Sequence, residues 1–460
     1  MNILTADIGS TYTKLTAIDT VEKKILATST AFTTIGTDVV EGFMSAYNKL
    51  EQRVGEFRYD ELLCCSSAAG GLKMVSLGLV PELTAKAAKL AAASAGAKVV
   101  KTYAFELSQA EQNEIFEINP DLVLLCGGTD GGNKEVILAN ARRLCRVERP
   151  FTVIAAGNKS ASFELEEIFR ASGKPFVITE NVMPEFNKLN IEPARQKIKE
   201  LFISRIIKAK GLSRIQKMCE TDIIPTPLAV LNACELLSKG TKNVSGLGDL
   251  LAVDIGGATT DVYSICSGKP TLENVTLKGL PEPVSKRTVE GDLGMRYSLP
   301  SLVGELDMDT LSEELSIDKS IAIDWVTACT QNPDLLAEPG SPEQEIEELI
   351  ARNAVKIAME RHAGTYQPVY TPFGQVFTLT GKDLSAVPFV IGIGGVIINA
   401  RQPRYILEGA KLQPDDFMFA KPKDPDYLID KRYIFASMGL LSSAYPDLAL
   451  TLLKQEITKQ

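Results

Sequence analysis

The sequence predicts an α/β protein made of two related halves, with a doubly wound α/β module inserted into the first half. Two observations support this prediction. An apolar strand followed by Asp, Ile, Gly, small residues and Thr occurs twice, within residues 2–14 and 249–262. Between these copies, residues 72–185 alternate short apolar runs with helical stretches. A repeated unit indicates duplication, and strands that alternate with helices indicate a parallel sheet.

Length and composition limit the classes of protein that this chain can belong to. The chain has 460 residues, a formal net charge of −9, 45% hydrophobic residues and 23% charged residues. This length predicts two or three domains. No basic run, membrane-length apolar stretch or N-terminal secretion signal is present. We expect a cytoplasmic protein that binds neither nucleic acid nor membrane.

The first half is expected to begin with a meander. Residues 2–8, 12–19 and 24–33 predict three consecutive strands, and 61–66 predicts a fourth. Residues 38–53 predict a helix whose apolar side chains share one face. These side chains are Val39, Val40, Phe43, Met44, Tyr47 and Leu50.

The inserted module is expected to contain a parallel sheet. Its predicted strands are Val99–Ala104, Leu122–Cys126, Thr152–Ala156 and Phe176–Thr179, and its predicted helices lie near 84–96, 108–117, 134–145 and 162–171. Glycines follow two of the strands, at 127–132 and 157. They mark either a ligand site at the carboxyl ends of the strands or plain tight turns. No Gly-x-Gly-x-x-Gly follows a strand here, so a dinucleotide site is not predicted.

The remaining elements complete the two halves. Residues 190–219 predict solvated helix, and 223–240 predict a helix whose Ala229 and Ala233 permit close packing against a second small-residue helix at 434–441. After a Gly/Ser-rich hinge, strands are expected at 250–255, 259–267 and 271–278, a helix at 343–362 and a hairpin at 368–380. We expect domains at 1–240 and 241–460, with a module at about 72–185. The C-terminal helix, about 434–460, is expected to return to the first half.

The chemistry is expected at the two repeated turns. Each strand places a carboxylate, Asp7 or Asp254, before a turn of small residues and hydroxyls. Glycine lets backbone N–H groups approach a phosphate, and a nearby carboxylate can hold Mg²⁺ through water. An ordinary Gly-rich hairpin beside a solvated Asp is the alternative for one copy, but the repetition favours a ligand held by both halves.

Histidine and cysteine provide little support for other chemistry. The single histidine, His362, is placed at a helix end or on the surface, with catalysis as the less favoured alternative. The eight cysteines include no Cys-x-x-Cys pair, and most are expected to be buried. A zinc or iron–sulfur site built by the protein is therefore not expected.

Five stretches, taken in order, resemble the actin/sugar kinase/Hsp70 superfamily of ATPases. They are similar to its first phosphate motif, first connecting helix, second phosphate motif, adenosine motif and second connecting helix. The corresponding residues are Asp7–Lys14, Ile224–Leu237, Asp254–Asp261, Ile391–Val396 and Phe435–Leu441. The resemblance implies a duplicated ribonuclease H-like fold of the actin/Hsp70 type.

Three further motifs resemble the MutL-type protein that accompanies adenosylcobalamin-dependent glutamate mutase. They are Ser66–Met74, Glu290–Gly294 and Thr380–Leu384. This resemblance spans the whole chain and implies an ATP-dependent reactivating factor, a slow Mg²⁺-dependent ATPase that acts as a chaperone and releases damaged cobalamin from the mutase. The implied cofactors are ATP and Mg²⁺, and the implied partner is the mutase.

The resemblance also assigns site residues. Asp7 and Asp254 would be catalytic and would hold Mg²⁺ through water, and Asp261 would either orient a water or hydroxyl or cap the turn. Lys14 is either a phosphate partner or a surface lysine. The phosphates would contact Gly9, Ser10, Thr11, Gly256, Gly257, Ala258 and Thr259, and the adenosine would lie on Gly392, Gly394 and Gly395.

Other functions remain open at this point. A small-molecule kinase of the same fold would have a polar acceptor pocket and would turn over ATP faster with its metabolite. A structural filament would assemble with ATP. An activator of a reductive dehydratase would need cysteines that bridge an iron–sulfur cluster, and the adjacent Cys64 and Cys65 have poor geometry for that role.

Overall fold

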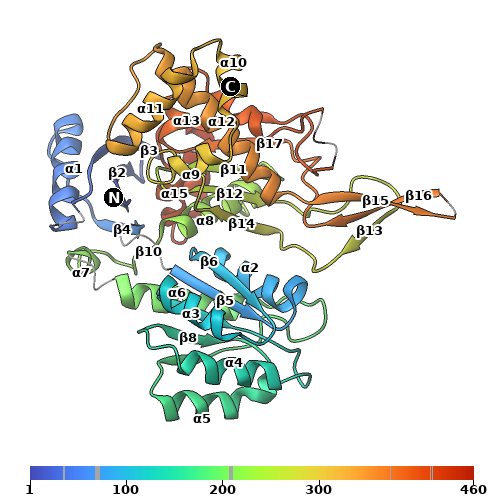
Figure 1. Cartoon of the computed structure of the whole chain (residues 1–460). Helices are drawn as coiled ribbons and strands as arrows, with labels where there is room; N and C mark the ends of the chain where they lie inside the picture. The colour runs from blue at the N-terminus through green and yellow to red at the C-terminus, as the bar shows by residue number, and fades with distance from the viewer. Residues whose placement is uncertain (35–36, 68–72, 207–210, 373, 415, 417) are drawn as a thin grey trace. The chain divides into compact units, whose positions relative to one another are not determined.

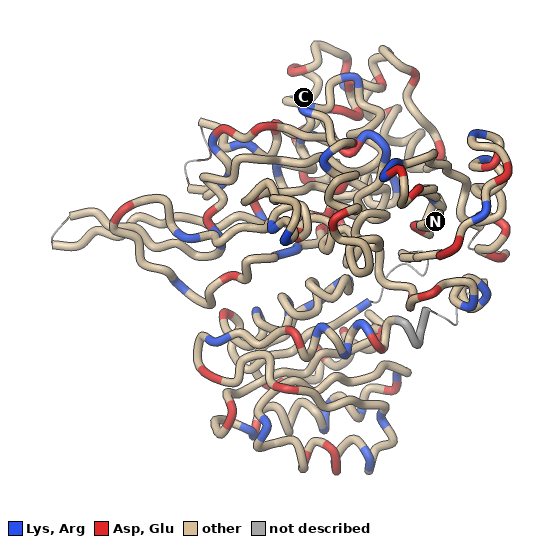
Figure 2. The backbone as a smooth tube through the Cα atoms, turned by 180° about the vertical axis from the view of Figure 1, so that it is seen from behind, with Lys and Arg blue, Asp and Glu red and all other residues tan. Residues whose placement is uncertain are grey.

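The computed structural model describes residues 1–34, 37–67, 73–206, 211–372, 374–414, 416 and 418–460 (Figure 1). The chain divides into two compact units. The first comprises Met1–Ala233, Gly279–Pro281 and Ala436–Leu452, and the second comprises Cys234–Lys278, Glu282–Phe435 and Leu453–Gln460. Charges of both signs are interspersed along the described chain (Figure 2). No helix within the described ranges is long and apolar enough to cross a membrane.

The first unit contains a five-stranded sheet with the order β10-β4-β1-β2-β3. Strands β1 to β3 form the predicted antiparallel meander, and β4 and β10 continue the sheet in parallel beyond β1. Helix α1 packs against β2 and β3 and is capped by the Asp38 carboxylate. The bounds are β1 Asn2–Ile8, β2 Tyr12–Asp19, β3 Lys24–Phe32, α1 Val39–Val54, β4 Glu61–Ser66 and β10 Ile224–Pro225.

The predicted face of α1 is confirmed except at one position. Val39, Phe43 and Leu50 are buried, but Met44 is 43% exposed. Ala46 and Gly42 take the space next to the sheet, and a Cβ on Gly42 would lie 2.6 Å from the Phe32 carbonyl oxygen. The helix therefore approaches the strands on its small residues, and Met44 lies outside that contact.

The inserted module is a parallel sheet with the order β6-β5-β7-β8-β9, as expected for a doubly wound unit. Its strands are β5 Lys73–Gly78, β6 Lys98–Ala104, β7 Leu122–Leu125, β8 Thr152–Ala155 and β9 Phe176–Ile178. Its helices are a π-helical turn Pro81–Ala85, α2 Lys86–Ser94, α3 Gln109–Ile118, α4 Glu135–Cys145, a 3₁₀ turn Lys159–Ala161, α5 Ser162–Ser172 and α6 Glu192–Ile206. The next helix, α7 Leu212–Gln216, contacts α1 instead.

Strand β5, which lies inside this sheet, was missing from the sequence prediction. Its first two residues, Lys73 and Met74, are the last two residues of the small-residue motif Ser66–Met74. Residues 68–72 of that motif lie outside the described residues.

The glycines after β7 serve the turn itself. A Cβ on Gly128 would lie 2.1 Å from the Asn133 carbonyl oxygen. The buried Asn158 accepts from the Gly131 N–H and donates to the Gly132 carbonyl, and Asn181 donates to the Gly128 carbonyl. The close contacts and these amide bridges favour the tight-turn alternative.

The second unit repeats the strand order of the first. Its main sheet runs β14-β12-β11-β17-β18-β19, with β14, β12 and β11 antiparallel and β17 and β18 parallel to β11. The bounds are β11 Leu250–Ile255, β12 Thr260–Ile265, β14 Ser285–Glu290, β17 Phe389–Ile393, β18 Asp426–Asp430 and β19 Ile457–Lys459. Two sheets built in the same order confirm the predicted duplication.

Helices and a small sheet complete the second unit. The helices are α9 Leu299–Gly304, α10 Met308–Leu315, α11 Lys319–Gln331, α12 Pro342–His362, α13 Gly395–Ile398, α14 Pro403–Leu407 and a 3₁₀ turn Glu408–Ala410. The small sheet consists of β13 Val275–Lys278, β16 Gly374–Thr380 and β15 Thr365–Thr371. Strands β15 and β16 confirm the predicted hairpin, although Phe373 of its turn lies outside the described residues.

The strand predicted at residues 271–278 is present in its second half, as β13, but it belongs to the small sheet. There it pairs with β16, whereas β14 takes the place beside β12. Strand β14 carries Lys286 and Arg287, which are buried with ion partners. A strand that contains charged residues lacks the apolar pattern by which strands are predicted. Such charges can be buried only with partners, and here the partner of Arg287 is distant in sequence.

Three of the boundaries between the units lie within helices. These helices are α8 Thr226–Lys239, α15 Phe435–Leu441 and α16 Pro446–Glu456. Within the first unit, α8 and α15 meet at their smallest residues, since a Cβ on Gly439 would lie 1.7 Å from the Ala229 carbonyl oxygen. The predicted contact between the small-residue helices is confirmed at Ala229.

His362 is the last residue of α12, as predicted, but it is fully buried and not on the surface. Its Nδ1 lies 2.8 Å from Thr288 Oγ1, and its Nε2 lies 2.8 Å from Ser264 Oγ. Burial, together with the nearby ammonium groups of Lys286 and Lys382, lowers the pKa of His362 well below its ordinary value. The ring therefore stays neutral in the folded protein.

We expect acid to destabilise the protein through this one ring. In the unfolded chain His362 takes up a proton near pH 6.5, but in the fold it does not, so stability is present above that pH and is lost as the pH falls below it. The loss is about 1.4 kcal/mol per pH unit. Melting temperatures of wild type and His362→Gln between pH 7 and pH 5 measure it. The wild type should fall more steeply, and parallel curves would contradict the assignment.

Candidate functional site

The first predicted phosphate turn follows β1. The Gly9 N–H donates to the Tyr12 carbonyl at 3.0 Å and closes the turn. A Cβ on Gly9 would lie 2.7 Å from that carbonyl oxygen, so glycine is required there. Within the described part of the chain, the N–H groups of Ser10 and Thr11 donate to no acceptor. Two adjacent unpaired N–H groups in a turn provide a site for an anion.

The second turn has the same geometry. The Gly256 N–H donates to the Thr259 carbonyl at 2.9 Å. In the register of the two hairpins, Asp254 lies opposite Asp261 as Asp7 lies opposite Lys14. The two turns are thus equivalent residue by residue, and they differ in the charge of the residue opposite the leading aspartate.

The second turn is held from its carbonyl side by residues 294–298. Three of its carbonyl oxygens, those of Gly256, Gly257 and Ala258, each accept at least one hydrogen bond. The donors are the N–H groups of Met295, Arg296 and Tyr297 and the hydroxyl of Ser298, at 3.0, 2.8, 2.8 and 2.8 Å. Among described residues, the N–H groups of Gly257 and Ala258 have no acceptor. The carbonyls are therefore occupied and the donors remain available for an anion.

This contact gives a structural role to the last glycine of the Glu290–Gly294 motif. A Cβ on Gly294 would lie 2.4 Å from the Ala258 carbonyl carbon. The Ser298 hydroxyl also bonds the Gly291 carbonyl at 2.8 Å, which ties the motif to the turn. The motif therefore packs against the carbonyl groups of the phosphate turn, on the side away from its available N–H groups.

The Asp7 carboxylate is almost fully buried and has three partners. Thr226, the first residue of α8, donates its hydroxyl to Oδ1 at 2.7 Å. The Cys65 thiol lies 3.5 Å from the same oxygen, and the Lys14 ammonium lies 3.5 Å from Oδ2. Burial raises the pKa of the Cys65 thiol well above its ordinary value, so the thiol stays protonated and can donate. Lys14 is thus an ion partner of Asp7 and not a free surface lysine.

Asp261 forms an ion pair with Arg287 of β14. The guanidinium donates from Nε at 2.8 Å, and both side chains are more than 90% buried. Burial would lower the pKa of Arg287, but the charges of Asp261 and Tyr263 and the hydrogen bonds to both side chains together raise this pKa above its ordinary value. The other Asp261 oxygen accepts from the Thr259 hydroxyl at 3.1 Å. Both oxygens are engaged, so the geometry favours the alternative in which Asp261 holds the turn.

The predicted adenosine glycines have different surroundings. Gly394, with φ +104°, lies against the end of β11, where a Cβ would be 2.3 Å from the Ile255 carbonyl oxygen and 3.0 Å from Asp254 Oδ1. Gly392 is enclosed by the side chains of Ile397 and Leu407 and serves packing. A Cβ on Gly395 would meet nothing within 4 Å. Gly394 and Gly395 therefore lie next to the second phosphate turn.

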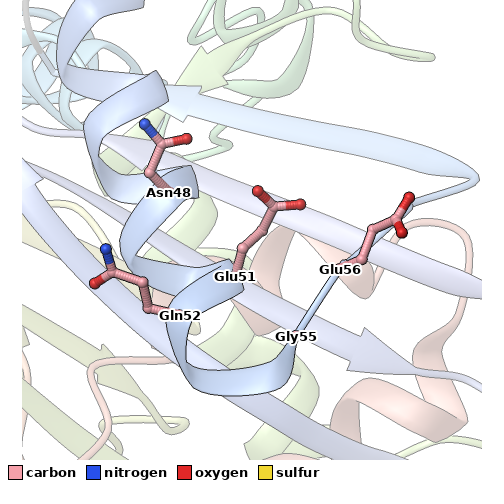
Figure 3. A pocket seen from close by; sticks show the side chains of 5 residues that line it. All are labelled: Asn48, Glu51, Gln52, Gly55 and Glu56. Carbon is pink, nitrogen blue, oxygen red and sulfur yellow. The ribbon is translucent and has the colours of Figure 1, made fainter.

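The predicted residues thus form two groups, one in each unit. Sequence analysis missed Thr226, Arg287 and the loop after Gly294, because each is recognised only through a contact distant in sequence. A surface hollow of about 400 Å³ lies elsewhere in the first unit, at the end of α1 (Figure 3). It is lined by Asn48, Glu51, Gln52, Gly55 and Glu56, whose two carboxylates would repel a phosphate.

The two sheets share the order of five strands, and each has an aspartate before a turn whose N–H groups include two without an acceptor among the described residues. These features define a protein of the actin/sugar kinase/Hsp70 fold class. The chain belongs to the MutL family, whose family model, described as MutL protein, matches residues 3–457. A curated relative, Protein MutL of Clostridium tetanomorphum, is 46% identical over 460 residues, which cover 99% of each chain.

The solved structures that the chain matches are more distant. The activator of 2-hydroxyisocaproyl-CoA dehydratase from Clostridium difficile has 10% identity and a TM-score of 0.30, with 99% of this chain and 98% of that chain covered. A glycerol dehydratase reactivase has 10% identity and a TM-score of 0.35, with 96% and 99% covered. Xylulose kinase from Lactobacillus acidophilus has 12% identity and a TM-score of 0.35, with 100% and 92% covered. These TM-scores are low, so the fold assignment depends on the strand order.

Proposed function

We propose that this protein is an ATP-dependent reactivating factor, a chaperone that releases damaged cobalamin from an adenosylcobalamin-dependent glutamate mutase in the cytoplasm. The observation that carries the nucleotide part is the pair of equivalent turns, each with a carboxylate and two N–H groups that have no acceptor in the part of the chain that the structure describes. The MutL family membership supports the mutase as partner.

The residues at both turns fit ATP and Mg²⁺. The N–H groups of Ser10, Thr11, Gly257 and Ala258 suit phosphate oxygens, and the hydroxyls of Thr11 and Thr259 lie in the same turns. Asp7 and Asp254 would hold Mg²⁺ through water, and the open side of Gly395 would contact the adenosine. Bound Mg²⁺ neutralises phosphate charge, which phosphoryl transfer requires.

The protein's own groups favour slow turnover. Both oxygens of Asp261 are engaged by Arg287 and Thr259, and Asp7 Oδ1 is engaged by Thr226. Such groups can position a nucleotide, but they are poorly placed to accept a proton from water. A slow ATPase is suited to a conformational cycle, in which ATP binding and hydrolysis would bias the helices that contain the unit boundaries.

The inserted module would contact the partner enzyme. It exposes several large apolar side chains, which would be available for contact with a partner. The most exposed are Phe163 and Phe186, each 70% exposed, followed by Phe105 at 60%.

Reactivation of an inactivated mutase tests this proposal. The enzyme, with damaged cobalamin bound, is mixed with this protein, Mg²⁺, fresh adenosylcobalamin and either ATP or a non-hydrolysable analogue. We expect activity to return with ATP only, and the Asp254→Asn variant serves as the control that lacks turnover. ATP binding without any recovery would contradict the reactivating role, and faster ATP turnover with a small metabolite would identify a kinase instead.

A further inference from the structure

We propose that Thr226 is a positioning residue that fixes the Asp7 carboxylate and leaves one defined oxygen for a metal-bound water. This inference rests on the proposed nucleotide function. Neither the repeated motif nor the family match assigns a role to Thr226, which lies 219 residues after Asp7 in the chain.

The two oxygens of Asp7 have different surroundings. Oδ1 accepts from the Thr226 hydroxyl at 2.7 Å and lies 3.5 Å from the Cys65 thiol, so protein donors already surround it. Oδ2 faces the Lys14 ammonium at 3.5 Å, which is longer than a hydrogen bond in the usual range. Oδ2 is therefore the oxygen that a metal-bound water can reach, once Lys14 shifts.

The rotation of the carboxylate decides whether this oxygen is available. The terminal torsion of an aspartate is broad, so the carboxylate needs an outside contact to hold one orientation. The threonine side chain is stiff because its Cβ is branched. A stiff hydroxyl at the start of α8 fixes the orientation of Asp7 and links it directly to the helix that packs on α15.

Asp254 obtains its position differently. Gly394 approaches it so closely that a Cβ would lie 3.0 Å from Oδ1. Backbone packing therefore restricts the second aspartate, and the first is surrounded by side-chain donors. Among these donors Thr226 makes the shortest contact, at 2.7 Å, which makes it a sensitive position for metal-dependent binding.

The test measures ATP binding to the full-length protein by calorimetry over a range of Mg²⁺ concentrations. Thr226→Val removes the hydroxyl at nearly constant volume, and Thr226→Ser retains it. Loss of a hydrogen bond to a charged group predicts that the Val variant needs about tenfold more Mg²⁺ for half-maximal binding. Binding of ATP without Mg²⁺ should be unchanged, and Ser should restore the wild-type requirement.

Controls separate positioning from general stability. Thr5→Val removes another buried threonine hydroxyl from β1 and should leave the Mg²⁺ requirement unchanged. Thr226→Ala provides a second variant without the hydroxyl if the Val variant does not fold. Wild-type Mg²⁺ dependence in a folded Val or Ala variant would overturn this inference alone. Failure of the wild type to bind ATP would overturn the proposed function and this inference with it.

Discussion

Asp254→Asn is expected to lower ATP turnover by about 100-fold or more while the protein stays folded. The substitution keeps the size of the side chain at the end of β11 but removes the charge that would hold metal-bound water beside the second turn. Phosphate release under saturating ATP measures turnover, and the melting temperature reports the fold.

A matched variant next to the same strand controls for this result. Asp249 is exposed and lies just before β11, so Asp249→Asn removes an equal charge away from the turn and should leave turnover unchanged. Near-normal turnover in Asp254→Asn would refute the proposed site.

Arg287→Met is expected to destabilise the protein by about 3–5 kcal/mol, because it leaves the buried Asp261 carboxylate without its ion partner. It should also weaken ATP binding, since Asp261 holds the Thr259 hydroxyl in the second turn. Denaturant unfolding and calorimetry measure the two effects.

The double variant Asp261→Asn/Arg287→Met should be less destabilised than the single Arg287 variant, because no unpaired charge then remains buried. Arg170→Met breaks an exposed pair on α5 and should cost below about 0.5 kcal/mol. Equal stability losses in Arg287→Met and Arg170→Met would show that the buried pair has no special role.

The sequence was sufficient for the parts of the fold that local patterns specify. The turns after Asp7 and Asp254 follow from apolar runs that lead into glycine, and the meander strands, α12 and the hairpin β15–β16 were also predicted from local patterns. Buried charges were the main obstacle, since Lys286 and Arg287 lie inside a strand that no hydrophobic pattern predicts. His362 was placed at a helix end correctly, but its burial depends on hydroxyls from β12 and β14.

The candidate site could be predicted only as far as its backbone. The repeated order of aspartate, glycine and small residues predicted both turns. The groups that would bind an anion there are backbone N–H groups, so the residue pattern alone was enough to locate them. The contact of Thr226 with Asp7 could not be predicted from the sequence. A threonine at the start of a helix is common because its hydroxyl can cap the helix, so its presence does not indicate a site residue. The partners of Asp7 and Asp261 depend on strand neighbours that only the folded sheets define.

The contact between Ala229 and Gly439 has a mechanical consequence. Where side chains separate two helices, rotamer changes can absorb a small displacement, but here the Ala229 carbonyl lies against a residue with no side chain. The Thr16 hydroxyl of β2 also lies 3.0 Å from the Ser437 hydroxyl of α15, and this hydrogen bond connects α15 to β2. A shift of α8 by a fraction of an ångström would therefore displace α15 by a similar amount, because few side chains at this contact can rearrange to absorb the movement.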